Sequence, residues 1–275
     1  MEYRSNRSLD PKKRKKKVRK NLIIFVQTLV IIALVIALTV VSSNYISLKN
    51  SINSNNSSGA SSITDSSTES NTEILVDETK EWYLKLVNPD LSVTNEFISS
   101  VKLTNIDSRF TDGKESSKFL DERVAEAFVN MCEAALKDGI ALKSVSAYRT
   151  YNYQNNLFNN RVERCVNEGY SREEAKKVAA TIVAIPGTSE HHLGLAVDIN
   201  SVEESFEDTT AFRWLQQNAE NYGFIMRYSK EKKSITKIIY EPWHYRYVGV
   251  EHAKRINELN MCLEEYIDYL KAGNK

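Results

Sequence analysis

The stretch that decides the fold is SEHHLGLAVDI, residues 189–199. In its second half apolar residues alternate along the chain, and this alternation is typical of a β-strand. On such a strand Leu195, Val197 and Ile199 face the core, whereas Asp198 points to the opposite side. The pattern therefore predicts a strand from which a single aspartate projects.

Two adjacent histidines precede this strand. If the backbone is extended there, the side chains of His191 and His192 diverge, so the two cannot easily serve one metal ion together. Gly194 permits a turn that brings one of them back beside Asp198. The residues alone do not choose between the two: one histidine is a candidate ligand, and the other is a candidate partner of the site.

A second motif, YEPWHYRYV at residues 240–248, supplies a third histidine. Glu241 lies three residues before His244, and Pro242 fixes the bend between them. Hydrolytic zinc sites combine a ligand of this type with a carboxylate that stays off the metal. A His, Asp and His set leaves a fourth position open for water, and Glu241 would take the proton of that water as it attacks a carbonyl. Each residue also has a simpler explanation, such as a hydrogen-bonded core histidine or a salt-bridged acid, and no H-E-x-x-H pattern is present.

The bulk composition is that of an ordinary globular protein. The 275 residues are 27% charged and 41% hydrophobic, with a formal net charge of +1. Cys132, Cys165 and Cys262 are an odd number without a C-x-x-C pair, which favours buried apolar side chains over a disulfide framework; one disulfide is the alternative. Composition alone therefore names no function.

The N-terminal part has the pattern of a membrane anchor. Residues 1–20 contain ten Lys or Arg and two acids, and residues 22–41 contain three polar side chains and no charged one. About 20 such residues cross the hydrocarbon core as a helix. We therefore expect a transmembrane signal-anchor helix over 21–43, with a basic tail at 1–20 that the positive-inside rule leaves in the cytoplasm. A cleaved signal peptide and a buried core helix are the alternatives.

The regions on either side of this span are a basic tail and a polar segment. The basic tail could be read as a nucleic-acid patch, but next to an apolar span it indicates topology and contact with anionic lipid, so we expect no nucleic-acid partner. Residues 44–78 are rich in Ser and Asn and poor in large apolar side chains, which predicts a disordered stalk. The folded domain is expected over 79–275, outside the cytoplasm.

Within this domain helices and strands alternate without a regular βαβ rhythm. A capping box of Ser171 with Glu174 marks the start of one helix. Apolar spacing predicts helices at 121–137, 151–168, from 171 onward, at 209–221 and at 251–271, and strands at 141–147, 195–199, 235–240 and 244–248. This order indicates an α+β domain with a small, mainly antiparallel sheet flanked by helices and preceded by one transmembrane helix.

The two motifs resemble those of a known family. Ser-x-His-x-x-Gly-x-Ala-x-Asp at 189–198 and Glu-x-x-His at 241–244 are similar to the VanY-like D-alanyl-D-alanine carboxypeptidases, in the lysostaphin, D-Ala-D-Ala peptidase and hedgehog zinc superfamily. The similarity continues in the family's order at 146–150, 185–187 and 222–228. It covers the folded domain, but not the anchor and the stalk.

The resemblance implies a metal site and its base. It makes His191, Asp198 and His244 the ligands of one Zn²⁺ per chain, and so chooses His191 over His192. It makes Glu241 the catalytic base.

The resemblance also implies how substrate is held. Arg149 matches an arginine that lies over the family's site, where it stabilises the developing oxyanion or binds a substrate carboxylate. Ser189 and Gln154 match positions that line the pocket and contact the C-terminal D-residue. Their simpler explanations are a capped turn for Ser189 and an ordinary helix face for Gln154.

The function implied is a zinc carboxypeptidase that removes the terminal D-alanine from peptidoglycan stem peptides. Relatives with these motifs cut D,D or L,D bonds, so that choice stays open. The alternatives are an endopeptidase of the same fold and a non-catalytic wall-binding module. Together with the anchor, this implies a single-pass protein of a bacterial, Gram-positive cell membrane, with its catalytic domain outside.

Overall fold

The computed structural model describes residues 81–274. The predicted basic tail at 1–20, the transmembrane helix at 21–43 and the stalk at 44–78 lie outside these residues. Among the helices within 81–274, none is both long enough and apolar enough to cross a membrane. The described part is the domain expected from residue 79 onward.

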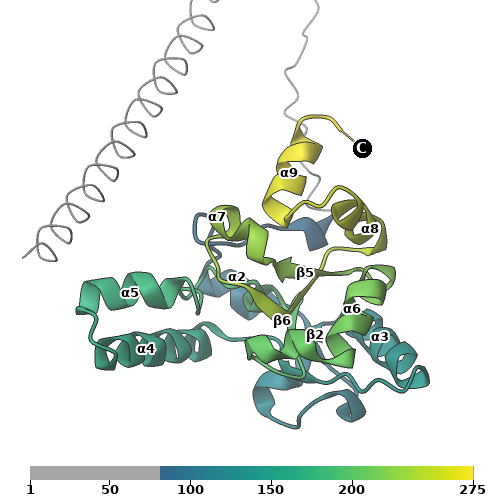
Figure 1. Ribbon diagram of the computed structural model, residues 1–275, viewed down its shortest axis with the longest axis horizontal. Coiled ribbons are helices and arrows are strands. Elements are labelled where there is room, and N and C mark those ends of the chain that lie inside the picture. Colours follow the sequence, from purple (N-terminus) through teal and green to yellow (C-terminus); the bar gives the residue numbers. More distant parts are fainter. Residues whose placement is uncertain (1–80, 275) are drawn as a thin grey trace, which may run out of the picture. The chain divides into compact units, whose positions relative to one another are not determined.

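A four-stranded antiparallel sheet lies at the centre of this domain (Figure 1). In spatial order its strands are β3 (Ser144–Ser146), β4 (Ala196–Ile199), β6 (Glu241–Tyr247) and β5 (Phe224–Tyr228). A separate antiparallel pair consists of β1 (Leu103–Asn105) and β2 (Phe119–Asp121). Small antiparallel sheets with helices around them confirm the predicted α+β class.

The main apolar core packs on one face of β4. Phe128 of α3 (Ala125–Lys137) is fully buried there together with Val197 of β4. α6 (Thr210–Asn218) adds Leu215 to the same core. Burial of such a side chain stabilises the fold by about 1.5–3 kcal/mol, so this face of the strand is dedicated to stability.

The two C-terminal helices form a second, smaller core. Ile256 of α8 (Val250–Glu258) and Ile267 of α9 (Leu263–Lys271) pack against Ile225 of β5. Because β5 is an edge strand of the four-stranded sheet, this core fastens both helices to that edge.

α4 (Tyr151–Asn167) and α5 (Arg172–Ala180) form a helical hairpin, called the arm below, that extends to one side of the sheet (Figure 1). The predicted capping box is confirmed, because the Ser171 side chain accepts from the Glu174 N–H and the Glu174 carboxylate accepts from the Ser171 N–H. The arm has a small apolar cluster of its own around Val162.

One predicted strand is wrong, and the strands β1, β2 and β5 were not predicted. Residues 235–240 are not a strand: the helical turn α7 (Lys233–Thr236) lies there, and Lys237 has a left-handed φ of 64°, which a strand does not adopt. Strand β5 is buried along most of its length, so no clear alternation of polar and apolar residues marks it. Strands β1 and β2 have three residues each, which is too short for a pattern.

The single helix predicted over 251–271 is also wrong, because the structure has α8 and α9 instead. Asn260 has a left-handed φ of 50°, which breaks the helical backbone. A new helix then begins after Cys262, whose backbone N–H donates to the Glu265 carboxylate. The short helix α2 (Asn95–Ser100) was not predicted either.

Candidate metal centre and active site

Strand pairing brings two of the predicted residues together. In the β4–β6 ladder Asp198 lies directly opposite His244, and residues opposite each other project to the same face with their side chains in reach. The distance between Asp198 Oδ1 and His244 Nδ1 is 3.1 Å. Both side chains are buried, and they lie on the face of β4 opposite to the main core.

His191 reaches the same point from a turn. Glu190–Leu193 form a 3-10 helix, not an extended segment, and the helix ends at Gly194 with a left-handed φ of 67°. A Cβ at Gly194 would lie 2.7 Å from Asp121 N, so both the conformation and the close approach require glycine. The turn places His191 Nε2 at 3.4 Å from Asp198 Oδ1.

These three side chains fit a metal ion. His191 Nδ1 lies 2.7 Å from Ala147 O; a carbonyl oxygen only accepts, so Nδ1 carries the proton and Nε2 keeps its lone pair. Within 81–274, Asp198 Oδ1 is buried and finds no hydrogen-bond partner. One candidate ligand atom from each of the three residues lies within 4.8 Å of the others. A tetrahedral zinc site with bonds of about 2.0–2.2 Å separates its ligand atoms by roughly 3.3–3.6 Å, so the donor set and the spacing both suit zinc.

The charges around this group are strongly coupled. Burial lowers the pKa of His191 to about 4, so its ring is neutral at pH 7. Burial opposes a charge on Asp198, but His191 and Arg149 outweigh it and hold the pKa of Asp198 well below its usual range. Burial also lowers the pKa of His244, yet the carboxylates of Asp198 and Glu190 outweigh it and raise the value to about 9. A metal ion that binds here therefore displaces a proton from His244 at neutral pH.

Glu241 lies beside this group at the start of β6. Its Oε2 is 3.5 Å from His244 Nδ1, the nitrogen that also faces Asp198. Burial raises the pKa of Glu241 to about 8. A carboxyl group of this kind, next to a metal position, can take up and return a proton near neutral pH.

Arg149 is held over the site by several fixed partners. Its Nη2 donates to Asp198 Oδ2 at 2.6 Å, its Nε donates to Ser146 Oγ, and its Nη1 donates to Gln154 Oε1 at 3.3 Å. Gln154 is fully buried, and its Nε2 donates to Ala184 O. The Arg149 side chain is 14% exposed, so the guanidinium is fixed but still accessible to an anionic group. Gln154 therefore contacts Arg149 directly, and its contact with the terminal D-residue of a substrate stays a prediction.

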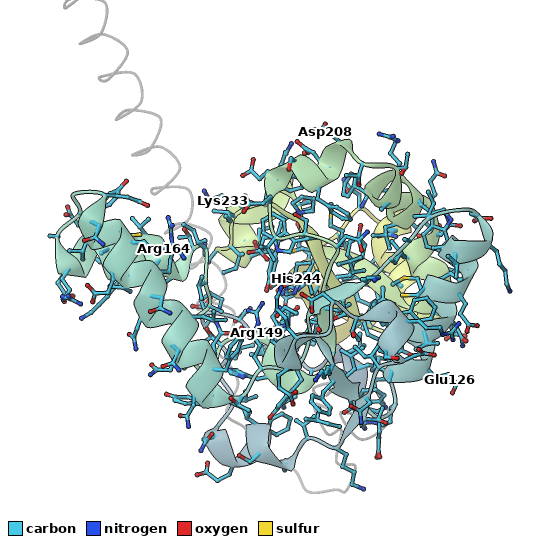
Figure 2. The ribbon with its side chains drawn as sticks, turned by 90° about the horizontal axis from the view of Figure 1, so that it is seen from below. Glu126, Arg149, Arg164, Asp208, Lys233 and His244 are labelled. Carbon is cyan, nitrogen blue, oxygen red and sulfur yellow. The ribbon has the colours of Figure 1, made fainter. Side chains whose placement is uncertain are left out.

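The remaining predicted residues occupy the edge of the group. Ser189 is buried just before the 3-10 helix, where its side chain does not cap that helix. His192 points away, since its Nδ1 lies 2.7 Å from Arg149 O and its Nε2 accepts from Gly187 N. The structure thus groups His191, not His192, with Asp198. Figure 2 shows Arg149 and His244 near each other in the middle of the domain.

Comparison with known proteins agrees with this geometry. A family model described as VanY, D-alanyl-D-alanine carboxypeptidase, matches residues 117–250. A D-alanyl-D-alanine carboxypeptidase of Enterococcus faecalis (strain ATCC 700802 / V583) is 37% identical over 191 residues, which are 70% of this chain and 68% of the relative. A putative carboxypeptidase of Bacillus subtilis (strain 168), YodJ, is 37% identical over 201 residues, 70% of each chain. The chain belongs to the VanY family. The resemblance of the motifs is confirmed.

Solved structures of VanY relatives share the fold. A mutant of the vancomycin resistance D,D-pentapeptidase VanY from a VanB-type cassette, in complex with Zn(II), has a TM-score of 0.59 at 38% identity and covers 68% of this chain and 99% of that chain. The LdcB LD-carboxypeptidase has a TM-score of 0.60 at 38% identity and covers 68% of this chain and 86% of that chain. Relatives with D,D and with L,D in their names thus match almost equally well.

In this VanY family member the structure shows a further acidic residue behind the site, which was not predicted from the sequence. Glu190 is fully buried, and its Oε2 lies 3.6 Å from His244 Nε2. Arg227 and Arg246 of β5 and β6 are buried around it. The available signal was an arginine within each of two otherwise mostly apolar or aromatic strands, because a buried cation requires a buried acid.

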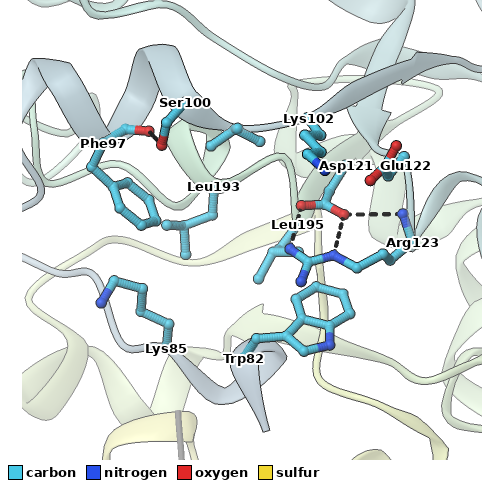
Figure 3. A pocket seen from close by; sticks show the side chains of 11 residues that line it. Trp82, Lys85, Phe97, Ser100, Lys102, Asp121, Glu122, Arg123, Leu193 and Leu195 are labelled. Carbon is cyan, nitrogen blue, oxygen red and sulfur yellow. Dashed lines mark hydrogen bonds and ion pairs between the residues drawn. The ribbon is translucent and has the colours of Figure 1, made fainter. Parts of the chain in front are cut away.

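A separate pocket of about 550 Å³ lies away from this VanY site (Figure 3). Trp82, Phe97 and Leu195 are among its lining residues, and Leu195 belongs to the core-facing set next to β4. The arginine of this pocket, Arg123, has partners within the protein. It pairs with Asp121 at 2.7 Å and lies 3.4 Å from the centre of the Trp82 ring. The pocket lining contains none of the candidate metal ligands and does not include Glu241.

Proposed function

We propose that this VanY family member is a zinc-dependent carboxypeptidase that removes the C-terminal D-alanine from peptidoglycan stem peptides. The observation that carries the proposal is the buried group of His191, Asp198 and His244, with the Glu241 carboxyl group 3.5 Å from His244 Nδ1. Relatives support both parts of it: one VanY structure is in complex with Zn(II), and a VanYB structure is in complex with D-alanine-D-alanine.

The metal would be held by His191 Nε2, Asp198 Oδ1 and His244 Nδ1, one zinc ion in each chain. Zinc at this position supplies a Lewis acid that polarises the scissile carbonyl and lowers the pKa of water. Two of the three donors are pre-oriented, because Ala147 O fixes the His191 tautomer and Arg149 holds the second oxygen of Asp198. Such outer contacts keep a site ready for its ion.

Glu241 is proposed as the general base and acid. As an ionised carboxylate it takes a proton from the attacking water, and it then gives that proton to the amino group of the departing D-alanine. The raised pKa of about 8 favours the second half of this cycle. Burial of Glu241 also keeps bulk water from the transferred proton.

Arg149 is proposed to bind negative charge on the substrate. Its guanidinium is the group that Gln154 and Ser146 hold in place, and it remains partly exposed. It would hold the C-terminal carboxylate of the peptide or the oxyanion that develops on the scissile carbonyl. Ser189, buried next to the ligand turn, is proposed to contact the terminal D-residue.

We also propose that the site works at the outer face of a cell membrane. The support is the sequence pattern of a basic tail, a span of about 20 residues without charge, and a polar stalk. A peptidoglycan stem peptide lies on that side of the membrane.

The test is release of free D-alanine by the purified full-length chain in detergent. Pentapeptide and tetrapeptide muropeptides are supplied separately, and Glu241→Ala serves as the inactive control. We expect D-alanine from at least one of the two substrates, and which one decides between D,D and L,D specificity. Release from neither contradicts the proposal, and products larger than a single amino acid indicate an endopeptidase.

A further inference from the structure

A group of buried charges lies directly behind the proposed metal site. Glu190 Oε1 accepts from Arg227 Nε at 2.8 Å and lies 2.8 Å from Arg246 Nη1. All three side chains are fully buried. Arg227 also pairs with Glu264 of α9 at 2.6 Å, so two acids balance two arginines. A buried carboxylate that accepts from guanidinium groups is held as an anion at a fixed position.

The two oxygens of Glu190 have different surroundings. Both arginine contacts are on Oε1, whereas Oε2 faces His244 Nε2 at 3.6 Å. Within the described part of the chain, Oε2 and His244 Nε2 are both buried without a hydrogen-bond partner. Two unsatisfied buried groups of complementary kind, an anion and a ring nitrogen, therefore face each other slightly beyond hydrogen-bonding distance.

We propose that Glu190 is a positioning residue that accepts the Nε2–H of His244 and thereby fixes the ring with Nδ1 toward the metal. A proton held on Nε2 leaves the lone pair on Nδ1, which is the nitrogen 3.1 Å from Asp198 Oδ1. A hydrogen bond from the far nitrogen of a metal-binding histidine also makes the near nitrogen a better donor. This inference rests on the metal site proposed above.

Neighbouring residues in the sequence build both parts of this arrangement. Glu190 and His191 are consecutive residues of one 3-10 helix, so a single turn carries one proposed ligand and the partner of another. Gly194, which ends that turn, fixes both at once. Arg227 and Arg246 come from the two strands that pair beside His244, which aligns the anion with its ring.

The decisive variants are Glu190→Gln and Glu264→Gln, made in the full-length chain. Each removes one carboxylate from Arg227, but only Glu190 approaches His244. Zinc dissociation constants are measured by competition with a chromophoric chelator, and folding is checked by circular dichroism. We expect Glu190→Gln to weaken zinc binding by about 10–100-fold and Glu264→Gln to leave it unchanged. Equal zinc affinity in wild type and Glu190→Gln, or an equal loss in both variants, overturns the proposal.

A second measurement uses the wild-type chain and so does not depend on the folding of any variant. In the zinc-loaded protein with ¹⁵N-labelled histidine, we expect His244 to show a slowly exchanging Nε2–H and a metal-bound Nδ1. A proton on Nδ1 with zinc on Nε2 overturns the proposal. Neither measurement involves release of D-alanine, so failure of this inference is distinguishable from failure of the proposed carboxypeptidase activity.

Discussion

The two faces of strand β4 are equally buried but differ in what fills them. Val197 and Ile199 are fully buried in the main apolar core. Asp198, only 2% exposed, lies on the other face among His191, His244 and Arg149. One strand of four residues thus supports the fold on one side and the proposed chemistry on the other.

This difference separates stability from function within one element. Apolar packing is non-directional and adds free energy in proportion to the buried area. The polar face must instead satisfy each charge with a specific partner, and a buried atom such as Asp198 Oδ1, which accepts no hydrogen bond from residues 81–274, is costly to the fold. We therefore expect substitutions on the core face to lower the free energy of unfolding and substitutions on the polar face to lower turnover.

The largest expected effect is on the polar face. Glu241→Gln should lower turnover by about 10²–10⁴-fold, because a general base contributes that much. Zinc content by elemental analysis should stay at the wild-type value, since Glu241 is beside the ligands and not one of them. Loss of zinc together with activity would instead make Glu241 a ligand.

A somewhat smaller effect is expected for Arg149→Met. Loss of a fixed donor to a developing oxyanion costs about 10²–10³-fold in turnover, and loss of carboxylate binding raises KM. The matched control is Arg172→Met, because Arg172 is an exposed arginine of the arm that pairs with Glu163. If both variants retain full kcat/KM on the same muropeptide, Arg149 has no role with substrate.

On the core face, Ile199→Ala should lower the free energy of unfolding by about 2–5 kcal/mol through lost burial and a cavity. Urea unfolding measures this loss. Zinc bound per folded chain should not change, because Ile199 faces away from the ligands. A variant of wild-type stability that fails to bind zinc would show that the two faces are not separate.

A smaller effect is expected for Glu264 of α9, which pairs with Arg227. Burial opposes its charge, but Arg227 outweighs burial and lowers the pKa of Glu264. Because the folded pKa is below the unfolded one, the carboxylate stabilises the fold above the unfolded pKa and loses this contribution as the pH falls. Glu264→Gln should cost about 1.5–3 kcal/mol at pH 7, and the difference from wild type should shrink as the pH is lowered through and below about 4.3. A difference that is constant with pH in urea unfolding would contradict the ion pair.

The smallest effect is expected far from the sheet. Ser171→Ala removes the capping box of α5 and should cost about 1 kcal/mol. Faster amide hydrogen exchange in the arm would report it, with D-alanine release unchanged. Altered kcat in this variant would mean that the arm takes part in catalysis.

Local patterns predicted the helices better than they predicted the contacts. The capping box of Ser171 and the strand alternation before Asp198 depend on neighbouring residues, and both are confirmed. The pairing of Asp198 with His244 depends on the register of strands far apart in the sequence, so the motifs could suggest it but not establish it. The roles assigned to these residues remain predictions.

The choice between the two histidines shows the same limit. From the residues alone His191 and His192 were equivalent, and only the family resemblance chose His191. The structure supplies a physical reason. Ala147 O binds only Nδ1 of His191, which leaves Nε2 for a metal ion, whereas both ring nitrogens of His192 are hydrogen-bonded, to Arg149 O and to Gly187 N. Glu190 was missed because its partners Arg227 and Arg246 come from β5 and β6, so the sequence around Glu190 itself does not reveal them.

The most direct test of the proposed centre is zinc content in a matched pair of variants. Wild type, His191→Ala and His192→Gln are purified as full-length chains, checked for folding by circular dichroism, and analysed for metal. We expect about one zinc ion per chain in wild type and in His192→Gln, and none in folded His191→Ala. Zinc retained by His191→Ala, or lost from folded His192→Gln, would contradict the site.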